Sequence, residues 1–119
     1  MTERIYSLLG LAMKAGKVSG GDMALQTVRD RKASILLIAE DASGNTLDRF
    51  RRAAERTGTP WAVCGTKEML GHAVGKGERS CLAVRDRGLA AGIYKLLQTQ
   101  GCEIHGELRA ARVKVHKNV

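Results

Sequence analysis

The chain has 119 residues, 44% apolar and 27% charged, and its 20 Lys and Arg against 12 Asp and Glu give a formal net charge of +8. This length suits a single domain, and the apolar fraction excludes a chain that is disordered throughout. Residues 35–39 form the longest aliphatic run, which is too short to span a bilayer, and residues 7–13 lack the flanks of a secretory signal. We therefore expect a cytoplasmic protein with no membrane partner, and the cations favour a nucleic acid.

Helical and strand patterns alternate along the chain. Apolar residues at helical spacing predict a helix over residues 3–15. Ser19, followed three residues later by Asp22, predicts an N-cap and a second helix that ends near Arg31. The aliphatic residues 35–39 predict a strand that is buried on both faces.

The second half of the chain continues this alternation. We expect a helix over 46–57 closed by Gly58, a strand over 61–64, a helix after Thr66, a strand over 80–84 and a last helix capped by Asp86. The pattern predicts an α/β domain over residues 1–98, with helices on both faces of a small sheet. Residues 99–119 are expected to form a basic C-terminal extension, either a solvated terminus or an arm that binds RNA.

Signals for catalysis, metal binding and disulfides are weak. The histidines have no Cys or carboxylate at metal-ligand spacing. The cysteines are odd in number and widely spaced, so we expect buried reduced thiols. The histidines are His72, His105 and His116, and the cysteines are Cys64, Cys81 and Cys102. We therefore expect a protein that is not an enzyme and that needs no cofactor and no metal.

Gly20 and Gly21 precede the second predicted helix. A helix that begins with small residues leaves its first backbone N–H groups unobstructed, and such a terminus can bind phosphates or base edges. Lys14 and Lys17 are close in sequence and supply cations for RNA recognition. The alternative is that the two glycines only shape a tight turn.

Five short motifs follow one another in an order that resembles the L-seven-Ae / L-thirty-e ribosomal-protein family, with the bacterial YlxQ-like branch as the nearest match. The motifs are SLLGLA at 7–12, GKV at 16–18, SGGD at 19–22, LIAEDAS at 37–43 and LGHAVG at 70–75. The resemblance covers about residues 3–98. It implies a three-layer α/β/α sandwich with a small mixed four-stranded sheet. It also implies binding to kink-turn RNA, in which tandem sheared G·A pairs bend a duplex sharply.

The resemblance also implies an RNA-binding site. The family motif that meets the G·A pairs falls on Gly20, Gly21 and Asp22, and a basic position one turn later holds Gln26. Asp22, Met23 and Gln26 replace the family's Asn, Glu and Lys. Two of these changes remove base-specific hydrogen bonds worth about 1–3 kcal/mol each, so the resemblance predicts weakened specificity.

The remaining implied contacts lie on loops and on the following helix. Ser43 and Leu47 fall where the family cradles an unstacked base, and residues 75–81 fall on its specificity loop. Phosphate contacts are expected from Lys14, Lys17, Lys67, Lys76 and Arg79. The basic loop favours binding that is strongly sensitive to salt.

Three functional hypotheses follow. The first is a monomeric RNA-binding protein, associated with the ribosome or rRNA, that recognises kink-turn-like structured RNA. The second is a protein–protein adaptor on the same scaffold in translation-related assemblies, which Met23 favours because an apolar side chain at a helix start suits a protein interface. The third is an RNA-recognition module for a separate RNA-modifying enzyme.

Overall fold

The computed structural model describes residues 3–108, and within them helices and strands alternate. In chain order the elements are α1 (Glu3–Lys14), β1 (Val18–Gly20), α2 (Gly21–Arg29), β2 (Ile35–Ile38), α3 (Gly44–Thr57), β3 (Trp61–Val63), α4 (Lys67–Ala73), β4 (Cys81–Val84), α5 (Arg87–Thr99) and β5 (Ile104–His105). The strands form one sheet in the order β1-β4-β2-β3-β5. β2 and β3 are parallel and the other neighbours are antiparallel, so the sheet is mixed.

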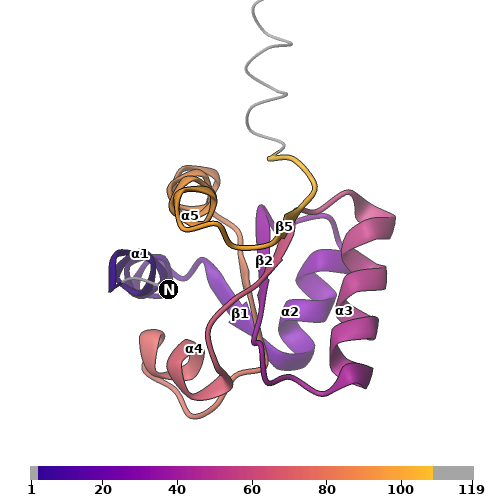
Figure 1. Cartoon of the computed structure of the whole chain (residues 1–119), viewed down its shortest axis with the longest axis horizontal. Helices are drawn as coiled ribbons and strands as arrows, with labels where there is room; N and C mark the ends of the chain where they lie inside the picture. Colours follow the sequence, from indigo (N-terminus) through magenta and orange to yellow (C-terminus); the bar gives the residue numbers. More distant parts are fainter. Residues whose placement is uncertain (1–2, 109–119) are drawn as a thin grey trace, which may run out of the picture.

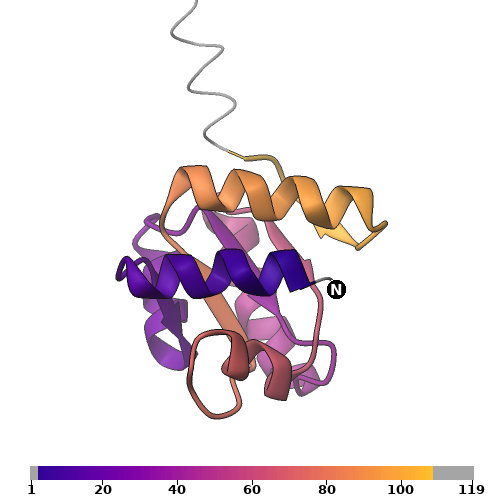
Figure 2. The ribbon, with the colours of Figure 1, turned by 90° about the vertical axis from the view of Figure 1, so that its left-hand side faces the viewer.

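The helices cover both faces of the sheet. α1, α4 and α5 lie on one face, and α2 and α3 lie on the other (Figure 1). α1 and α5 lie side by side across their face, with α4 beside them (Figure 2). The expected three-layer α/β/α sandwich is therefore confirmed.

β2 explains how the sheet joins the two layers. Its side chains alternate: Ile35 and Leu37 pack into the core beneath α1, α4 and α5, whereas Leu36 and Ile38 pack beneath α2 and α3. All four are fully buried. A strand that is covered on both faces needs a continuous aliphatic run, which is what residues 35–38 supply.

The sheet has five strands among the described residues, where four were expected. The additional edge strand, β5, pairs with β3, and the His105 ring stacks on Trp61 with ring centroids 4.1 Å apart. β5 lies within residues 99–119, which were expected to extend from the domain. The basic residues of that segment from 109 onward lie outside the described residues.

The start of α2 differs from the sequence-based prediction. Ser19 is not the N-cap, because it belongs to β1 and its Oγ lies 2.8 Å from the Thr27 Oγ1. The N-cap is Gly20. A strand of three residues is too short to produce a recognisable alternation, so β1 was missed.

Two further searches of residues 3–108 gave negative results. No helix there is long and apolar enough to cross a membrane. No group of three or more His, Cys, Asp or Glu side chains is arranged to hold a metal ion.

Candidate nucleic-acid interface

The N-terminus of α2 lacks the side-chain cap that three other helices have. Ser43, Thr66 and Asp86 each accept a hydrogen bond from a backbone N–H in the first turn of α3, α4 and α5. Gly20 offers no such acceptor to α2. No capping side chain therefore covers the first-turn N–H groups that follow Gly21, which leaves them open to an external acceptor, and the helix dipole favours a negatively charged one.

Gly21 keeps this helix start accessible. Its φ is +59°, a conformation that L side chains adopt only at a cost, and a Cβ placed there would have no heavy atom within 4 Å. The turn is thus both shaped by glycine and free of covering side chains.

Arg79 lies directly against this helix start. A Cβ on Gly20 would come within 3.0 Å of the Arg79 Cδ, so the missing side chain lets the arginine pass close to the strand. The Arg79 guanidinium donates hydrogen bonds to the carbonyl oxygens of Gly77 and Glu78, at 3.2 and 2.9 Å. The arginine therefore stabilises its own loop and also brings a cation to the α2 N-terminus.

Cys81 lies beneath the same turn. The Gly21 backbone amide hydrogen-bonds to its thiol, which lowers the thiol pKa, but burial acts more strongly and raises it to about 12. The thiol therefore stays protonated at neutral pH. Cys81 therefore packs beneath this surface as a neutral thiol, a form that is a poor nucleophile.

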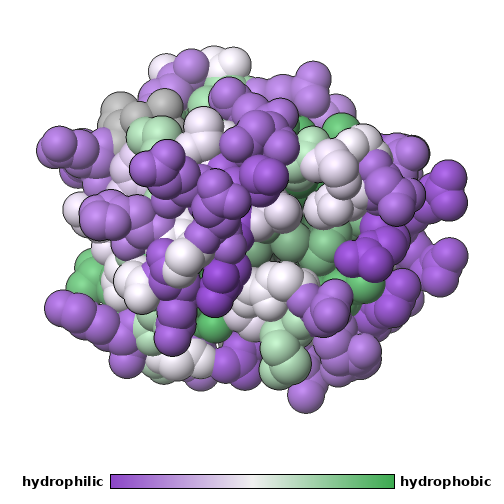
Figure 3. Space-filling view, turned by 90° about the horizontal axis from the view of Figure 1, so that it is seen from below, coloured by the Kyte–Doolittle hydropathy of each residue, from purple (hydrophilic) through white to green (hydrophobic). Residues whose placement is uncertain are grey.

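The α4–β4 loop and the β2–α3 loop are tied to each other at this end of the sheet. The Arg79 backbone N–H donates to the Lys67 carbonyl oxygen at 3.0 Å, and the Lys67 N–H donates to the Asp41 Oδ1 at 2.8 Å. The chain of contacts from Gly20 through Arg79 and Lys67 to Asp41 joins three segments of the sequence in one surface. Viewed from below, the molecule shows hydrophilic side chains around smaller apolar and neutral areas (Figure 3).

Ser43 and Leu47 lie at the start of α3, which follows the β2–α3 loop. The Ser43 Oγ accepts from the Thr46 N–H at 3.1 Å, so the hydroxyl already serves as the helix cap. Leu47 is half-buried and packs against the core beneath α2 and α3. The contact of both side chains with an RNA base stays a prediction.

Gln26 and Lys76 are the remaining residues that the sequence assigned to the α2 surface and its neighbouring loop. The Gln26 Nε2 donates to the Asp30 Oδ1 at 2.8 Å, one turn further along α2. Lys76 is exposed on the α4–β4 loop, and its backbone N–H donates to the Gly71 carbonyl oxygen at 2.8 Å.

Lys14 and Lys17 lie at the opposite end of β1. The register pairs Gly20 with Leu82 but Val18 with Val84, and the Lys17 carbonyl oxygen accepts from the Arg85 N–H at 2.8 Å. The structure therefore does not bring these two lysines to the α2 N-terminus. Their expected role as phosphate contacts remains a prediction for a different part of the surface.

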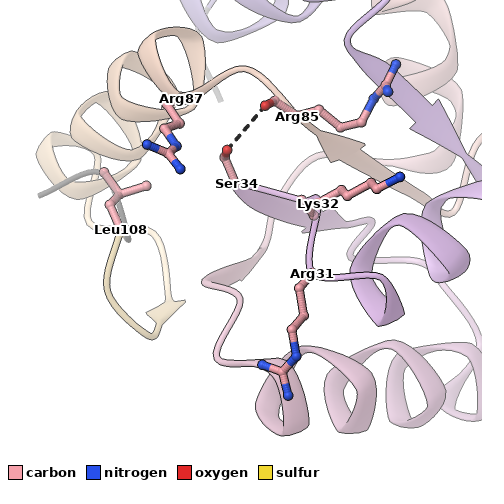
Figure 4. A pocket seen from close by; sticks show the side chains of 7 residues that line it. Arg31, Lys32, Ser34, Arg85, Arg87 and Leu108 are labelled. Atoms are coloured by element: carbon pink, nitrogen blue, oxygen red, sulfur yellow. Dashed lines mark hydrogen bonds between the residues drawn. The ribbon is translucent and has the colours of Figure 1, made fainter. Parts of the chain in front are cut away.

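A second basic feature, which we call the second hollow, lies at that opposite end. It has a volume of about 330 Å³, and its lining includes Arg31, Lys32, Ser34, Arg85, Arg87 and Leu108 (Figure 4). The Ser34 hydroxyl donates to the Arg85 carbonyl oxygen across it, at 3.4 Å.

Sequence reasoning missed a third basic feature, between α2 and α3. A hollow of about 520 Å³ there has walls that carry Arg29, Arg31, Arg49, Arg52 and Arg56. The spacing of Arg49, Arg52 and Arg56 places them on one side of α3 and was the only signal in the sequence. The contribution of Arg29 and Arg31 depends on how α2 packs against α3.

Two curated proteins resemble the chain in sequence. The chain is 36% identical over 93 residues to the RNA-binding protein YlxQ of Bacillus subtilis (strain 168), an alignment that covers 77% of this chain and 93% of the relative. It is 28% identical over 97 residues to the RNA-binding protein YlxQ of Enterococcus faecium, which covers 81% of this chain and 93% of that protein.

Two solved structures resemble the fold. A protein of unknown function from Bacillus halodurans C superposes with a TM-score of 0.75 and 28% identity, over 79% of this chain and 96% of that one. The Giardia lamblia 15.5kD RNA binding protein superposes with a TM-score of 0.67 and 20% identity, over 83% and 92%, which supports the fold alone. Residues 3–93, from α1 into α5, match the model of the ribosomal protein L7Ae/L30e/S12e/Gadd45 family, so the chain belongs to this family.

Proposed function

We propose that the chain binds structured RNA and that it recognises a kink-turn through the N-terminus of α2. The observation that carries the proposal is the uncapped first turn of α2, which Gly21 leaves open and which Arg79 flanks. The names of the two curated relatives, both RNA-binding proteins, support RNA as the polyanion that the net charge of +8 favours.

The backbone of α2 is suited to recognition by shape. Its free N–H donors are fixed in direction by the helix and cost no side-chain entropy to position. A sharply bent duplex with a widened groove admits such a helix start more readily than a regular A-form helix, whose major groove is deep and narrow. Selectivity then depends on the fit of the bend more than on side-chain hydrogen bonds, because the Asp22 carboxylate only accepts and the Met23 thioether is at most a weak acceptor.

Lys67, Lys76 and Arg79 are the cations proposed to contact phosphates at this site. All three belong to α4 or to the loop after it, and the contact between Arg79 and Gly20 holds that loop beside α2. Such contacts fix the orientation of the protein on the RNA but carry no sequence information of their own.

The target that we propose is a segment of ribosomal RNA. The chain would bind it as a monomer, in the cytoplasm. The support is the family itself, whose description is that of ribosomal proteins. The proposed role of this surface is binding, and burial keeps the Cys81 thiol beneath it protonated at neutral pH.

A binding titration with two RNAs tests the proposal. One RNA contains a kink-turn and the other has its G·A pairs converted to Watson–Crick pairs, each measured at two salt concentrations. We expect tighter binding to the intact turn at both salts. Equal binding to the two RNAs that is lost at higher salt would contradict recognition of the turn.

Single variants then test the surface. Lys67→Gln is expected to weaken binding. It should also make the fall of log K with log salt shallower by about one unit of slope, the value for one lost phosphate contact. Lys95→Gln is the matched control, because Lys95 lies on α5, which covers the other face of the sheet from α2 and α3. Equal slopes for the two variants would show that the surface is assigned wrongly.

A protein partner is the second candidate function, and Met23 is the observation that favours it. This side chain lies in the first turn of α2 and is 67% exposed, which is unusual for a large apolar residue. Binding of RNA with no preference for the turn, together with unchanged RNA affinity in Met23→Glu, would favour this second function.

A further inference from the structure

The groove between α2 and α3 concentrates cations more strongly than the α2 N-terminus does. The acids Asp22, Asp41 and Glu78 equal in number the cations Lys67, Lys76 and Arg79 that are assigned to the N-terminus, and Asp22 also pairs with Arg49 of the groove at 3.9 Å. The groove has five arginines and a single acid, Asp48, along its walls. Its field is therefore the stronger attraction for a polyanion.

The one acid of the groove is already paired with a cation outside it. The Asp48 Oδ1 accepts a hydrogen bond from the Arg51 guanidinium at 3.3 Å, and Arg51 also bonds to Glu55 at 3.2 Å. Across residues 3–108, Arg29, Arg52 and Arg56 have no ion pair with an acid. Their guanidinium groups are therefore available to an external acceptor.

The groove is continuous with the α2 N-terminus. Arg49 lies 3.9 Å from the Asp22 carboxylate at its near end. Arg49 and Arg56 are seven residues apart on α3, so the row extends about 10 Å along the helix axis at 1.5 Å per residue.

Arg31 marks the far end of the groove and joins it to the second hollow. It lines both spaces, and its guanidinium donates to the carbonyl oxygen of Thr57, the last residue of α3, at 3.3 Å. Figure 4 shows its side chain directed toward a helix, away from Lys32 and Arg85. Its φ of +61° is rare for a residue with a side chain, and it sets the direction in which the arginine leaves the end of α2.

We propose that the α2–α3 groove binds the phosphate backbone of an RNA stem that continues from the turn held at the α2 N-terminus. This inference rests on the proposed function, since it takes RNA as the ligand. Arginine forks match phosphate oxygens in geometry, and a row of them follows a backbone without reading bases. A duplex carries about one charge per 1.7 Å of axis, so 10 Å of stem presents about three phosphates on each strand.

The test compares two kink-turn RNAs that differ only in the length of one stem. The short RNA reaches the α2 N-terminus, and the long RNA adds one helical turn of duplex. The protein variant is Arg52→Gln/Arg56→Gln. The matched control is Arg4→Gln/Lys95→Gln, which removes the same charge from the groove between α1 and α5 on the other face of the sheet.

We expect the wild type to bind the long RNA more tightly than the short one and with a steeper salt dependence. The groove variant should lose this advantage. For the long RNA, its fall of log K with log salt should be shallower than that of the wild type by about two units of slope. Its binding to the short RNA should stay that of the wild type. The control variant should keep the advantage of the long RNA.

Two outcomes would overturn the inference: a groove variant that still prefers the long RNA, and equal losses in the groove and control variants, which would mean that only net charge matters. Arg31→Gly provides a second variant that keeps the fold, because glycine adopts a φ of +61° readily. It should reduce the advantage of the long RNA as well. If the wild type shows no preference for the intact turn but binding to the long stem still depends on Arg52 and Arg56, the proposed function fails and the groove stands.

Discussion

Replacing Gly71 by alanine tests how closely the α4–β4 loop must lie against α4. A Cβ built at Gly71 would fall 1.9 Å from the carbonyl oxygen and 2.6 Å from the carbonyl carbon of Gly77. Both are backbone atoms, so no side-chain rotation relieves the overlap. The loop has to retreat by about 1 Å to restore a tolerable contact of 3.0 Å.

The magnitude follows from opposing effects. In an unobstructed helix, Gly→Ala stabilises by about 0.5–1 kcal/mol. The overlap costs about 1–3 kcal/mol as overpacking. Retreat of the loop also strains the hydrogen bonds from Lys76 N–H to the Gly71 oxygen and from Arg79 N–H to the Lys67 oxygen, each worth about 0.5–1.5 kcal/mol. We expect Gly71→Ala to lower the free energy of unfolding by about 1–3 kcal/mol.

Gly10→Ala is the matched control, because Gly10 also lies inside a helix. Its Cβ would meet only the Ala73 carbonyl oxygen, at an ordinary contact distance of 3.4 Å. This variant should therefore be as stable as the wild type or more stable, by up to about 1 kcal/mol. Urea unfolding followed by circular dichroism gives both values.

The same pair links the loop to RNA binding. Retreat of the loop withdraws Arg79 from Gly20, so Gly71→Ala should bind kink-turn RNA more weakly at temperatures where it is still folded, whereas Gly10→Ala should bind as the wild type does. A Gly71→Ala protein as stable as Gly10→Ala, with unchanged RNA affinity, would refute the reasoning about loop packing.

Two further predictions concern charge at the helix start and the buried thiols. Asp22→Asn removes an exposed carboxylate from the turn that is proposed to face RNA, so RNA affinity should rise several-fold at low salt. The free energy of unfolding should fall by about 0.3–1 kcal/mol, because the helix dipole loses a favourable anion. Unchanged affinity in an RNA titration would place the RNA elsewhere. Burial raises the pKa of the Cys64 and Cys81 thiols to about 12, so both stay protonated in the folded protein when unfolded thiols ionise above about pH 9. Stability should therefore fall as pH rises above 9, and a Cys64→Ala/Cys81→Ala variant measured by urea unfolding should show a shallower fall; identical pH profiles would argue against burial as the cause.

The elements that the sequence predicted well are those set by local chemistry. Thr66 and Asp86 were predicted as N-caps, and they cap α4 and α5. Ser43 was not predicted as a cap, and it caps α3, which begins two residues earlier than expected, at Gly44. The aliphatic strand at 35–38 was equally clear, because burial on both faces leaves no polar position in it. β1 and β5 have three and two residues, and each exists only because a neighbouring strand is already in place.

The candidate site was predicted less completely, because proximity in sequence is a poor guide to proximity across a sheet. Lys17 is three residues from Gly20, yet an extended strand carries the chain about 10 Å over that interval, to the other end of the sheet. Arg79 is 59 residues away in sequence and touches Gly20. The family resemblance pointed to Lys67 and to the loop 75–81, which contains Arg79, and the contact of these residues with RNA stays a prediction.

The distribution of charge suggests how such a surface combines selectivity with affinity. At the α2 N-terminus, cations and acids nearly balance, so the proposed RNA binding there would depend on the direction of backbone donors and on the fit of a bent RNA. In the α2–α3 groove the arginines act on any phosphate backbone, and their contribution falls steeply with salt. Because Asp22, Met23 and Gln26 offer few base-specific contacts, the proposed groove would provide a larger share of the affinity. The two effects should therefore separate experimentally. The preference for an intact turn should persist as the salt concentration rises, whereas the gain in affinity from a longer stem should disappear.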